Sequence, residues 1–469
     1  MTGFGAVIGL IIGIVLIIRK FSPAYCLILA AVLGGLIGSL RPDLLVQIGW
    51  GSDWGLSACK ALLQDLSINT TVKQMIAGVQ DITPAILRIL TAGVLAGILV
   101  KTGAAARIAD SIVNGLGAKR VLPALVLAAF FLTFVGVFID VAVITVAPVA
   151  LAVGSKMNLS RMSVLLAMIG GGKSGNIISP NPNTIAAAEN FNADLSAVMF
   201  ENLFPALIGI LASILLASWI SRKGELLVPE PAENNSEDNA SDANASDSTR
   251  IVSQSPKMDD SQKSTELAES TPGPTLLAAL VGPVAAIGLL ALRPLAGLVI
   301  DPLIALPAGG LIGLAAMRRF GQIRTCLEYG LSRMAGVAIL LTGTGAVAGV
   351  IKASDLKDSI LAALNWANLP EITIAPLSGA VMSAATASTT AGASVASAAF
   401  GSAILAAGIS AVHAAAMVNA GATVLDHLPH GSFFHATAGA TGVDLIERLK
   451  LIPYETAIGA VLAVASVFL

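Results

Sequence analysis

The sequence predicts an all-α polytopic membrane protein with two inverted-topology repeats of about seven membrane segments each, including broken or re-entrant helices. Hydrophobic residues make up 55% of the 469 residues and charged residues only 12%, about half the share of a soluble domain. Apolar stretches of spanning length recur along the chain, and they are helices because backbone in hydrocarbon must satisfy its own hydrogen bonds. The order of features in the first half also recurs in the second.

Short matching segments reveal the internal repeat. The Asp-Ser-Ile triplet at residues 110–112 recurs at residues 358–360, which is 248 positions later. Each triplet is followed by a Leu-Pro pair, at residues 122–123 and 369–370. A duplication of one ancestral unit is the simplest explanation of this shared order.

Composition divides the chain into three regions. Residues 1–220 form the first membrane repeat and residues 275–469 the second. Residues 221–274 hold 5 basic and 11 acidic side chains among many Ser, Asn and Pro residues. Such a segment cannot bury enough apolar surface to fold, so we expect a disordered linker. The membrane segments are expected near residues 3–18, 23–40, 84–100, 121–138, 140–155, 162–178, 197–220, 275–292, 296–316, 335–351, 371–387, 388–406, 408–426 and 453–469.

The number of segments fixes the relative orientation of the repeats. Because seven is odd, the second repeat enters the bilayer upside down relative to the first. Basic residues at 19–20, 119–120, 222–223 and 318–324 then face one side, which the positive-inside rule makes the cytoplasm. The linker is therefore expected in the cytoplasm and both termini in the periplasm. Inverted repeats are common in secondary transporters, whose substrate sites lie near the membrane midplane on interrupted helices.

Composition also excludes several classes of function. The chain outside the linker holds 22 basic and 18 acidic residues, so no large basic face exists and nucleic-acid binding is not expected. The three cysteines, Cys26, Cys59 and Cys326, are far apart and do not form a metal-ligand pattern. The expected partners are the lipid bilayer and a small solute.

Two interruptions of the apolar pattern correspond between the repeats. In the first repeat Asp140 lies in an apolar run, where a charge costs about 2.5–3.5 kcal/mol on insertion scales. It is either a proton acceptor or cation ligand, or a carboxylate at a helix turn near the interface. In the second repeat, residues 386–394 contain five hydroxyl side chains, including Ser388, Thr389 and Thr390. These either line a polar cavity or allow helices to pack closely, and their number favours the cavity.

The second interruption of the first repeat covers residues 170–184. Three consecutive glycines at 170–172 and prolines at 180 and 182 predict a broken helix whose free backbone groups line a wet cavity. The leading glycine of a nucleotide P-loop is missing. Half-helix N-termini and Lys173 carry positive charge, so this loop is expected to receive a carboxylate. Replacing Lys173 with Ala is expected to lower anion affinity more than tenfold without loss of expression.

The corresponding interruption of the second repeat covers residues 419–435. Three of the four histidines lie there, and Asp426 precedes His427 directly. A proton relay suits these residues because histidine titrates near neutral pH. A metal site is disfavoured, since the His-x-x-His spacing to His430 is interrupted by Pro429. A set of solvent-facing loop histidines is the remaining interpretation.

At these motifs the chain resembles the gluconate:proton symporter (gluconate permease) family of bacterial inner-membrane carriers, within the ion-transporter superfamily. The resemblance covers nearly the whole chain except the linker and is closest over residues 101–110, 170–184 and 426–434. It implies an all-helical inverted-repeat carrier that takes up sugar acids or related hydroxy-carboxylates with protons. It also implies an acidic residue at Asp140 and a hydroxyl-rich tip at residues 388–390.

The chain departs from the pattern of this family at two places. Relatives typically have histidines in the glycine-rich loop and a Pro-Pro-His-Pro-like turn after it, where this chain has residues 173–176 and 179–182. Near His427 an Asn-Asp pair of the relatives is replaced by Pro429-His430. The identity of the substrate is therefore not carried over from the family.

We therefore expect a secondary active transporter that imports a small organic anion with protons, and not an enzyme. It is expected to be a homodimer in the bacterial inner membrane. No cofactor or metal is expected. The expected substrate-binding residues are Lys173, Ser174, Asn176, Asn181, Asn183, Thr184, Ser388, Thr389 and Thr390. The expected ion-coupling residues are Asp140, Asp426, His427 and His430. Sodium coupling is the alternative within this class, since broken-helix oxygens also suit Na⁺. An anion channel is the alternative of a different class.

Overall fold

The computed structural model describes residues 3–39, 68–117, 120–227, 273–356, 362 and 370–468, and the expected linker at 221–274 lies for the most part outside them. The helices of the first repeat are α1 (Gly3–Ile18), α2 (Pro23–Ser39), α5 (Ile68–Lys101), α6 (Ala104–Leu116), α7 (Val121–Phe134), α8 (Ile139–Lys156), α9 (Arg161–Asn176), α10 (Pro182–Asn190), α11 (Leu195–Glu201) and α12 (Leu203–Trp219). Those of the second are α14 (Leu276–Ala296), α15 (Pro302–Ala316), α16 (Ile323–Lys352), α18 (Ile374–Thr386), α19 (Thr389–Ala406), α20 (Ala411–Gly421), α21 (Ser432–Thr441) and α22 (Leu445–Val467).

The expected membrane segments coincide with helices, but their lengths differ. The helices α5 and α16 have 34 and 30 residues and extend well beyond the expected segments. Three short helices, α6, α10 and α21, were not expected, and the expected segment at 197–220 is divided into α11 and α12. Among the described residues, six helices are long and apolar enough to cross a membrane, or seven if α11 and α12, bent by 44°, form one span. This is fewer than the fourteen expected because seven of the corresponding helices have only 11 to 17 residues, namely α1, α2, α7, α9, α15, α18 and α20.

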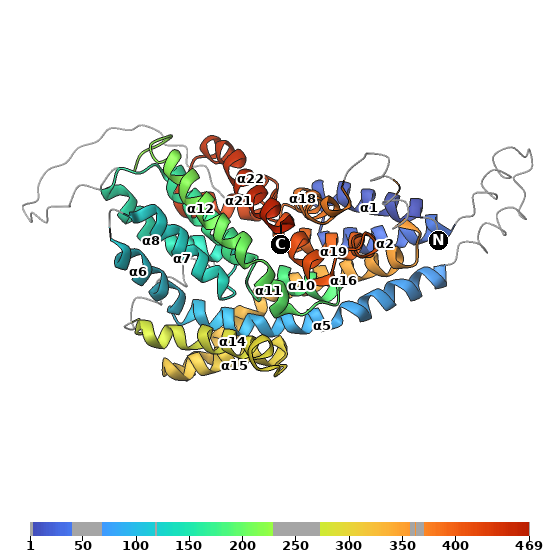
Figure 1. Ribbon diagram of the computed structural model, residues 1–469, viewed down its shortest axis with the longest axis horizontal. Helices are drawn as coiled ribbons and strands as arrows, with labels where there is room; N and C mark the ends of the chain where they lie inside the picture. Colours follow the sequence, from blue (N-terminus) through green and yellow to red (C-terminus); the bar gives the residue numbers. More distant parts are fainter. Residues whose placement is uncertain are drawn as a thin grey trace, which may run out of the picture.

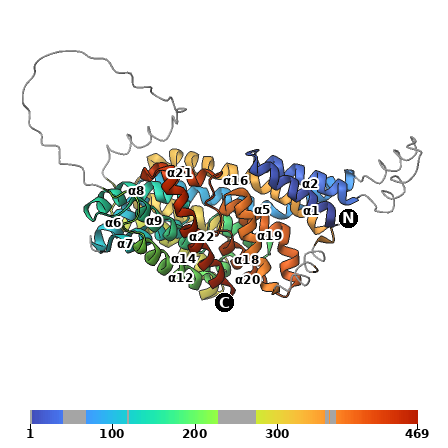
Figure 2. The same ribbon diagram turned by 90° about the horizontal axis from the view of Figure 1, so that it is seen from above.

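The packing of the helices is reciprocal between the repeats. The α1–α2 pair packs against α16, and its counterpart, the α14–α15 pair, packs against α5. In the same way α10 packs against α19, and α21 packs against α8. Figure 1 shows α5 running along one edge, with α14 and α15 at one end of it and α1 and α2 near the other. In Figure 2, α22 lies between the group α6–α9 and the group α18–α20.

The crossing of α5 and α16 shows that the repeats are inverted. Gly78 of α5 faces Gly345 and Gly349 of α16, whereas Gly330 near the other end of α16 faces Gly93 and Gly97, so the helices are antiparallel. The glycines form three pairs that are 252 residues apart, Gly78 with Gly330, Gly93 with Gly345 and Gly97 with Gly349. A Cβ at Gly78 would lie 2.1 Å from the carbonyl oxygen of Gly345, and one at Gly330 would lie 2.1 Å from that of Gly93. Side chains are excluded here, and the backbones touch.

The three glycines at 170–172 do not break their helix, which corrects the expectation from the sequence. The helix α9 runs through them to Asn176. Their role is close packing: a Cβ at Gly171 would lie 2.0 Å from the carbonyl oxygen of Val126 on α7. In membrane helices, small residues of this kind allow backbones to approach. The interruption instead begins after Asn176 and ends where Asn181 caps α10.

Candidate functional site

Two helical hairpins end in tips that come from corresponding parts of the repeats. The first tip lies between α7 and α8, with Gly136 at φ 97° and Asp140 in the first turn of α8. The second lies between α18 and α19, where Ala387 adopts φ 45° and Ser388 caps α19 by accepting a hydrogen bond from Ala391 N. A left-handed alanine carries backbone strain, which is characteristic of functional sites.

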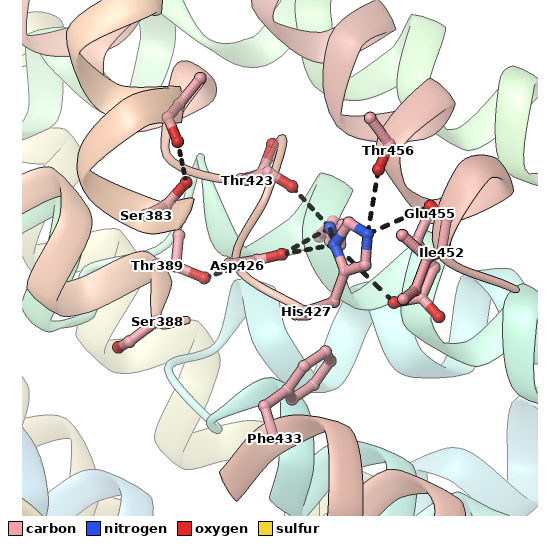
Figure 3. Close-up of polar contacts among 12 residues, drawn as sticks. Ser383, Ser388, Thr389, Thr423, Asp426, His427, Phe433, Ile452, Glu455 and Thr456 are labelled. Carbon is pink, nitrogen blue, oxygen red and sulfur yellow. Dashed lines mark hydrogen bonds and ion pairs between the residues drawn. The ribbon is translucent and has the colours of Figure 1, made fainter. Parts of the chain in front are cut away.

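Two helices are broken, and their interrupted parts lie close to these tips. The first break separates α9 from α10, and the side chain of Asn181 accepts a hydrogen bond from Thr184 N at the start of α10. The second separates α20 from α21 and contains Asp426 and His427, as Figure 3 shows. A half-helix that ends inside the protein has backbone N–H or C=O groups without a partner in the helix. These groups need hydrogen-bond partners from other protein groups or from a water-filled cavity.

Both tips and both breaks contribute to one cavity of about 350 Å³, which we call the tip cavity. The helix α16 and the start of α21 supply the remaining part of its lining. Polar residues come from every one of these elements. The polar lining residues are Asp140, Asn176, Ser332, Arg333, Ser388, Thr389, Thr390, Asp426 and Ser432.

Arg333 on α16 is the basic side chain of this lining. Its Nη2 donates a hydrogen bond of 2.8 Å to Asp140 Oδ2, and both side chains are partly exposed, at 37% and 29%. The guanidinium also lies 5.8 Å from the centre of the Phe138 ring. This arginine was not among the expected site residues, because the expected membrane segment began at residue 335 and left it outside. A longer apolar window would have placed it within the helix.

Lys173, which was expected to bind the substrate, does not line the tip cavity. Its side chain is fully buried, and Nζ donates to Thr423 O at 2.5 Å, to Asp426 Oδ1 at 2.6 Å and to His427 Nδ1 at 3.0 Å. An ammonium group has three N–H donors, and these partners use all three. Lys173 therefore holds the second broken helix in place and has no donor left for an anion.

His427 sits inside this buried cluster and is held from both ring nitrogens (Figure 3). Its Nε2 lies 3.2 Å from Ile452 O and 3.1 Å from Thr456 Oγ1. Its Nδ1 lies 3.0 Å from Lys173 Nζ and 3.2 Å from Asp426 Oδ1. Behind it, fully buried Glu455 pairs with Arg448 and lies 3.9 Å from His427 Nδ1. Besides the histidine, the cluster holds two basic groups, Lys173 and Arg448, and two acidic groups, Asp426 and Glu455.

Thr389 connects this cluster to the second hairpin tip. Its Oγ1 donates a hydrogen bond of 2.6 Å to Asp426 Oδ2, while Oδ1 of the same carboxylate faces Lys173. Asp426 lines the tip cavity, although only 3% of its side chain is exposed. This carboxylate is therefore the point where the buried cluster meets the cavity.

The other expected residues divide into two groups. Asn176 and residues 388–390 line the cavity. Ser174, Asn181, Asn183, Thr184, His427 and His430 do not. Among these, Asn183 donates to Asn419 Oδ1 at 2.7 Å, and Asn419 donates to Thr184 Oγ1 at 3.1 Å, so they join the two broken helices. His430 contacts Ala385 O at 3.3 Å.

Within the described ranges, no group of three or more His, Cys, Asp or Glu side chains is arranged to hold a metal ion.

Comparisons with known proteins agree with a transporter. The family model of GntP family permeases matches residues 56–256. An uncharacterized transporter of Haemophilus influenzae is 45% identical over 466 residues, which cover 99% of this chain and 97% of the relative. The inner membrane permease YgbN of Escherichia coli is 30% identical over 142 residues, which cover 30% of this chain and 31% of the relative.

One solved structure shares the fold. The YdaH transporter of Alcanivorax borkumensis, whose crystal structure is described as revealing an unusual topology, matches with a TM-score of 0.56 at 13% identity, over 97% of each chain. The predicted all-helical membrane fold is thereby confirmed.

Proposed function

Because this chain belongs to the GntP family of permeases, we propose that it is a secondary active transporter that imports a small organic anion with protons. The proposed substrate is a sugar acid or hydroxy-carboxylate such as gluconate, bound in the tip cavity. Transport by a multi-pass membrane protein is the function of the family, whereas the substrate and the coupling ion are our proposal.

The observation that carries the proposal is Arg333 in a cavity rich in hydroxyl groups. A guanidinium presents a planar set of N–H donors that matches a carboxylate. The hydroxyls of residues 388–390 and the amide of Asn176 share the same cavity and can pair with the hydroxyls of a sugar acid. A volume of about 350 Å³ also fits a small-molecule site.

Proton coupling is supported by the acidic groups of the cavity. Asp140 and Asp426 both line it, so a proton that enters the cavity meets a carboxylate before it reaches His427. The polar oxygens of the tips also suit Na⁺, which makes sodium the alternative coupling ion.

The surroundings of the transporter are also part of this proposal. We place the chain in the bacterial inner membrane as a homodimer, with the linker in the cytoplasm and both termini in the periplasm. The basic residues at 222–223 and 318–324 support this orientation.

Uptake of radiolabelled gluconate into proteoliposomes tests the proposal. We expect saturable, counterflow-competent uptake driven by an imposed pH gradient without sodium. The Arg333→Gln variant should lose at least tenfold in affinity, because a charge pair at 4 Å and an effective dielectric of about 20 contributes roughly 4 kcal/mol before desolvation. Arg324→Gln, whose wild-type side chain is 88% exposed, is the matched control. Unchanged affinity of Arg333→Gln contradicts the site. An absolute need for sodium contradicts the coupling ion, and uptake without counterflow indicates a channel.

A further inference from the structure

We propose that Asp140 is an internal ligand of Arg333, and that its protonation releases the guanidinium to bind the carboxylate of the substrate. This inference rests on the proposed function and gives it a coupling mechanism. Each bound anion then takes up one proton, because the substrate replaces a carboxylate that has become neutral.

The position of the pair supports this exchange. Asp140 is the first-turn residue of the hairpin tip and Arg333 belongs to α16, so two separate parts of the cavity wall meet in one contact of 2.8 Å. The contact lies on the lining of the tip cavity, where protons and solutes have access. A substrate carboxylate at Arg333 would lie beside ionised Asp140, and like charges repel at that distance. Neutral Asp140 removes this repulsion and frees the donor.

The groups around Asp140 single out Arg333 as its partner. Among the helices packed against α8, α7 carries no titratable side chain. The helix α16 adds Tyr329 to Arg333, and Lys101 of α5 lies over the Tyr329 ring at 4.7 Å. The remaining titratable groups on the packed elements and on the cavity wall are Arg107 and Asp110 of α6, Arg161 and Lys173 of α9, His435 of α21 and Asp426.

Three of those other groups, Lys173, Arg161 and His435, have partners of their own. Lys173 uses its three donors within the buried cluster. Arg161 donates to Thr441 O at 3.0 Å and pairs with Glu225. His435 contacts Pro429 O at 2.8 Å. In the part of the chain that the structure describes, Arg333 is the basic residue that forms an ion pair with Asp140.

The contrast with Asp426 explains why Asp140 is the exchanging group. Asp426 is 3% exposed and is held by both Lys173 and Thr389, so freeing it would disrupt the buried cluster. Asp140 is 29% exposed, and its contact with Arg333 lies on the wall of the tip cavity. A group that must gain and lose a proton in every cycle needs this accessibility.

The first experiment requires no ligand. Purified full-length protein in detergent is treated with phenylglyoxal, an arginine-specific reagent, and modification of Arg333 is measured by peptide mass spectrometry with exposed Arg324 as internal reference. We expect Asp140→Asn, and Asp140→Ser as a second variant, to raise the relative rate at Arg333 at least threefold. Asp110→Asn on the neighbouring α6 is the matched control. Unchanged rates in both Asp140 variants would show that Asp140 does not hold Arg333, and would overturn the inference.

The second experiment measures gluconate binding by titration calorimetry between pH 5.5 and pH 8. If one proton is taken up with each anion, the wild-type Kd rises about tenfold for each pH unit. Asp140→Asn should bind as tightly at pH 8 as at pH 5.5. A variant that keeps the wild-type pH slope overturns the inference but leaves the proposed function intact. Absence of binding by wild type and variant at every pH overturns both.

Discussion

Two ion pairs join different parts of this transporter and differ in what surrounds them. Lys173 and Asp426 are 0% and 3% exposed, and every donor of the lysine has a protein partner. Arg333 and Asp140 are 37% and 29% exposed and line a cavity. A buried pair whose donors are all used fixes structure, because separating it leaves charges without solvent. A pair on a cavity wall can open. A positive charge alone therefore does not identify the anion site. The site also needs hydrogen-bond donors that have no protein partner, and access from the cavity.

The largest effect that separates the two pairs is expected from Lys173→Met. This change leaves Asp426 buried without its ammonium partner, which typically costs about 3–5 kcal/mol. We expect severe loss of folded protein, measured as thermal unfolding in detergent. Arg333→Gln should stay within about 1 kcal/mol of wild type. Normal stability of Lys173→Met together with weaker anion binding would restore the original expectation from the sequence.

Replacing both partners sharpens the same comparison. The Lys173→Met and Asp426→Asn double variant removes both charges, and neutral replacement of a buried pair is often nearly neutral in stability. We expect it to recover at least half of the stability lost in Lys173→Met. The coupling energy comes from a double-mutant cycle that includes Asp426→Asn alone. Simple addition of the two losses would show that the pair does not act as a unit.

A smaller effect is expected where the buried pair meets the cavity. Thr389→Val removes the hydrogen bond of 2.6 Å to Asp426 Oδ2. Hydrogen bonds to charged groups contribute about 1.5–3 kcal/mol, and we expect the lower end because this oxygen faces the cavity. Thr390→Val, which changes a neighbouring lining residue, is the control. Equal unfolding temperatures for the two variants would argue that the tip is not fastened through Thr389.

The smallest effect is expected at an exposed pair. Lys352 and Asp81 join α16 and α5 at 2.7 Å, with side chains 53% and 61% exposed. Pairs of this kind contribute about 0–1 kcal/mol. We expect Lys352→Gln to change neither stability nor uptake measurably at physiological salt. A shift as large as that of Thr389→Val would mean that exposure is a poor guide to the importance of these pairs.

The sequence predicted the segments and the location of the site better than its chemistry. Apolar runs set the helices, and the four interruptions around residues 140, 170–184, 386–394 and 419–435 all contribute to the tip cavity. Those interruptions could be found because charged, hydroxyl and Gly/Pro residues are costly or unusual in a membrane helix. Their convergence follows from the inverted repeats.

The roles of individual residues could not be predicted in the same way. The glycines at 170–172 suggested a broken helix, but whether glycine breaks or packs depends on the neighbouring helix, here α7. Lys173 suggested an anion receptor, but its partner Asp426 is 253 residues away in sequence. Arg333 lay outside its expected segment, and its meeting with Asp140 depends on how the two repeats fit together.

The glycine contacts between α5 and α16 have a mechanical consequence. Sliding one helix along the other would bring side chains into places where only hydrogen atoms fit, at both ends of the crossing. The two helices are therefore expected to move as one rigid unit. Arg333 is one turn away from Gly330 and belongs to this unit, while the hairpins and broken helices form the rest of the cavity. Any movement of the hairpin tips against this unit changes their distance from Arg333.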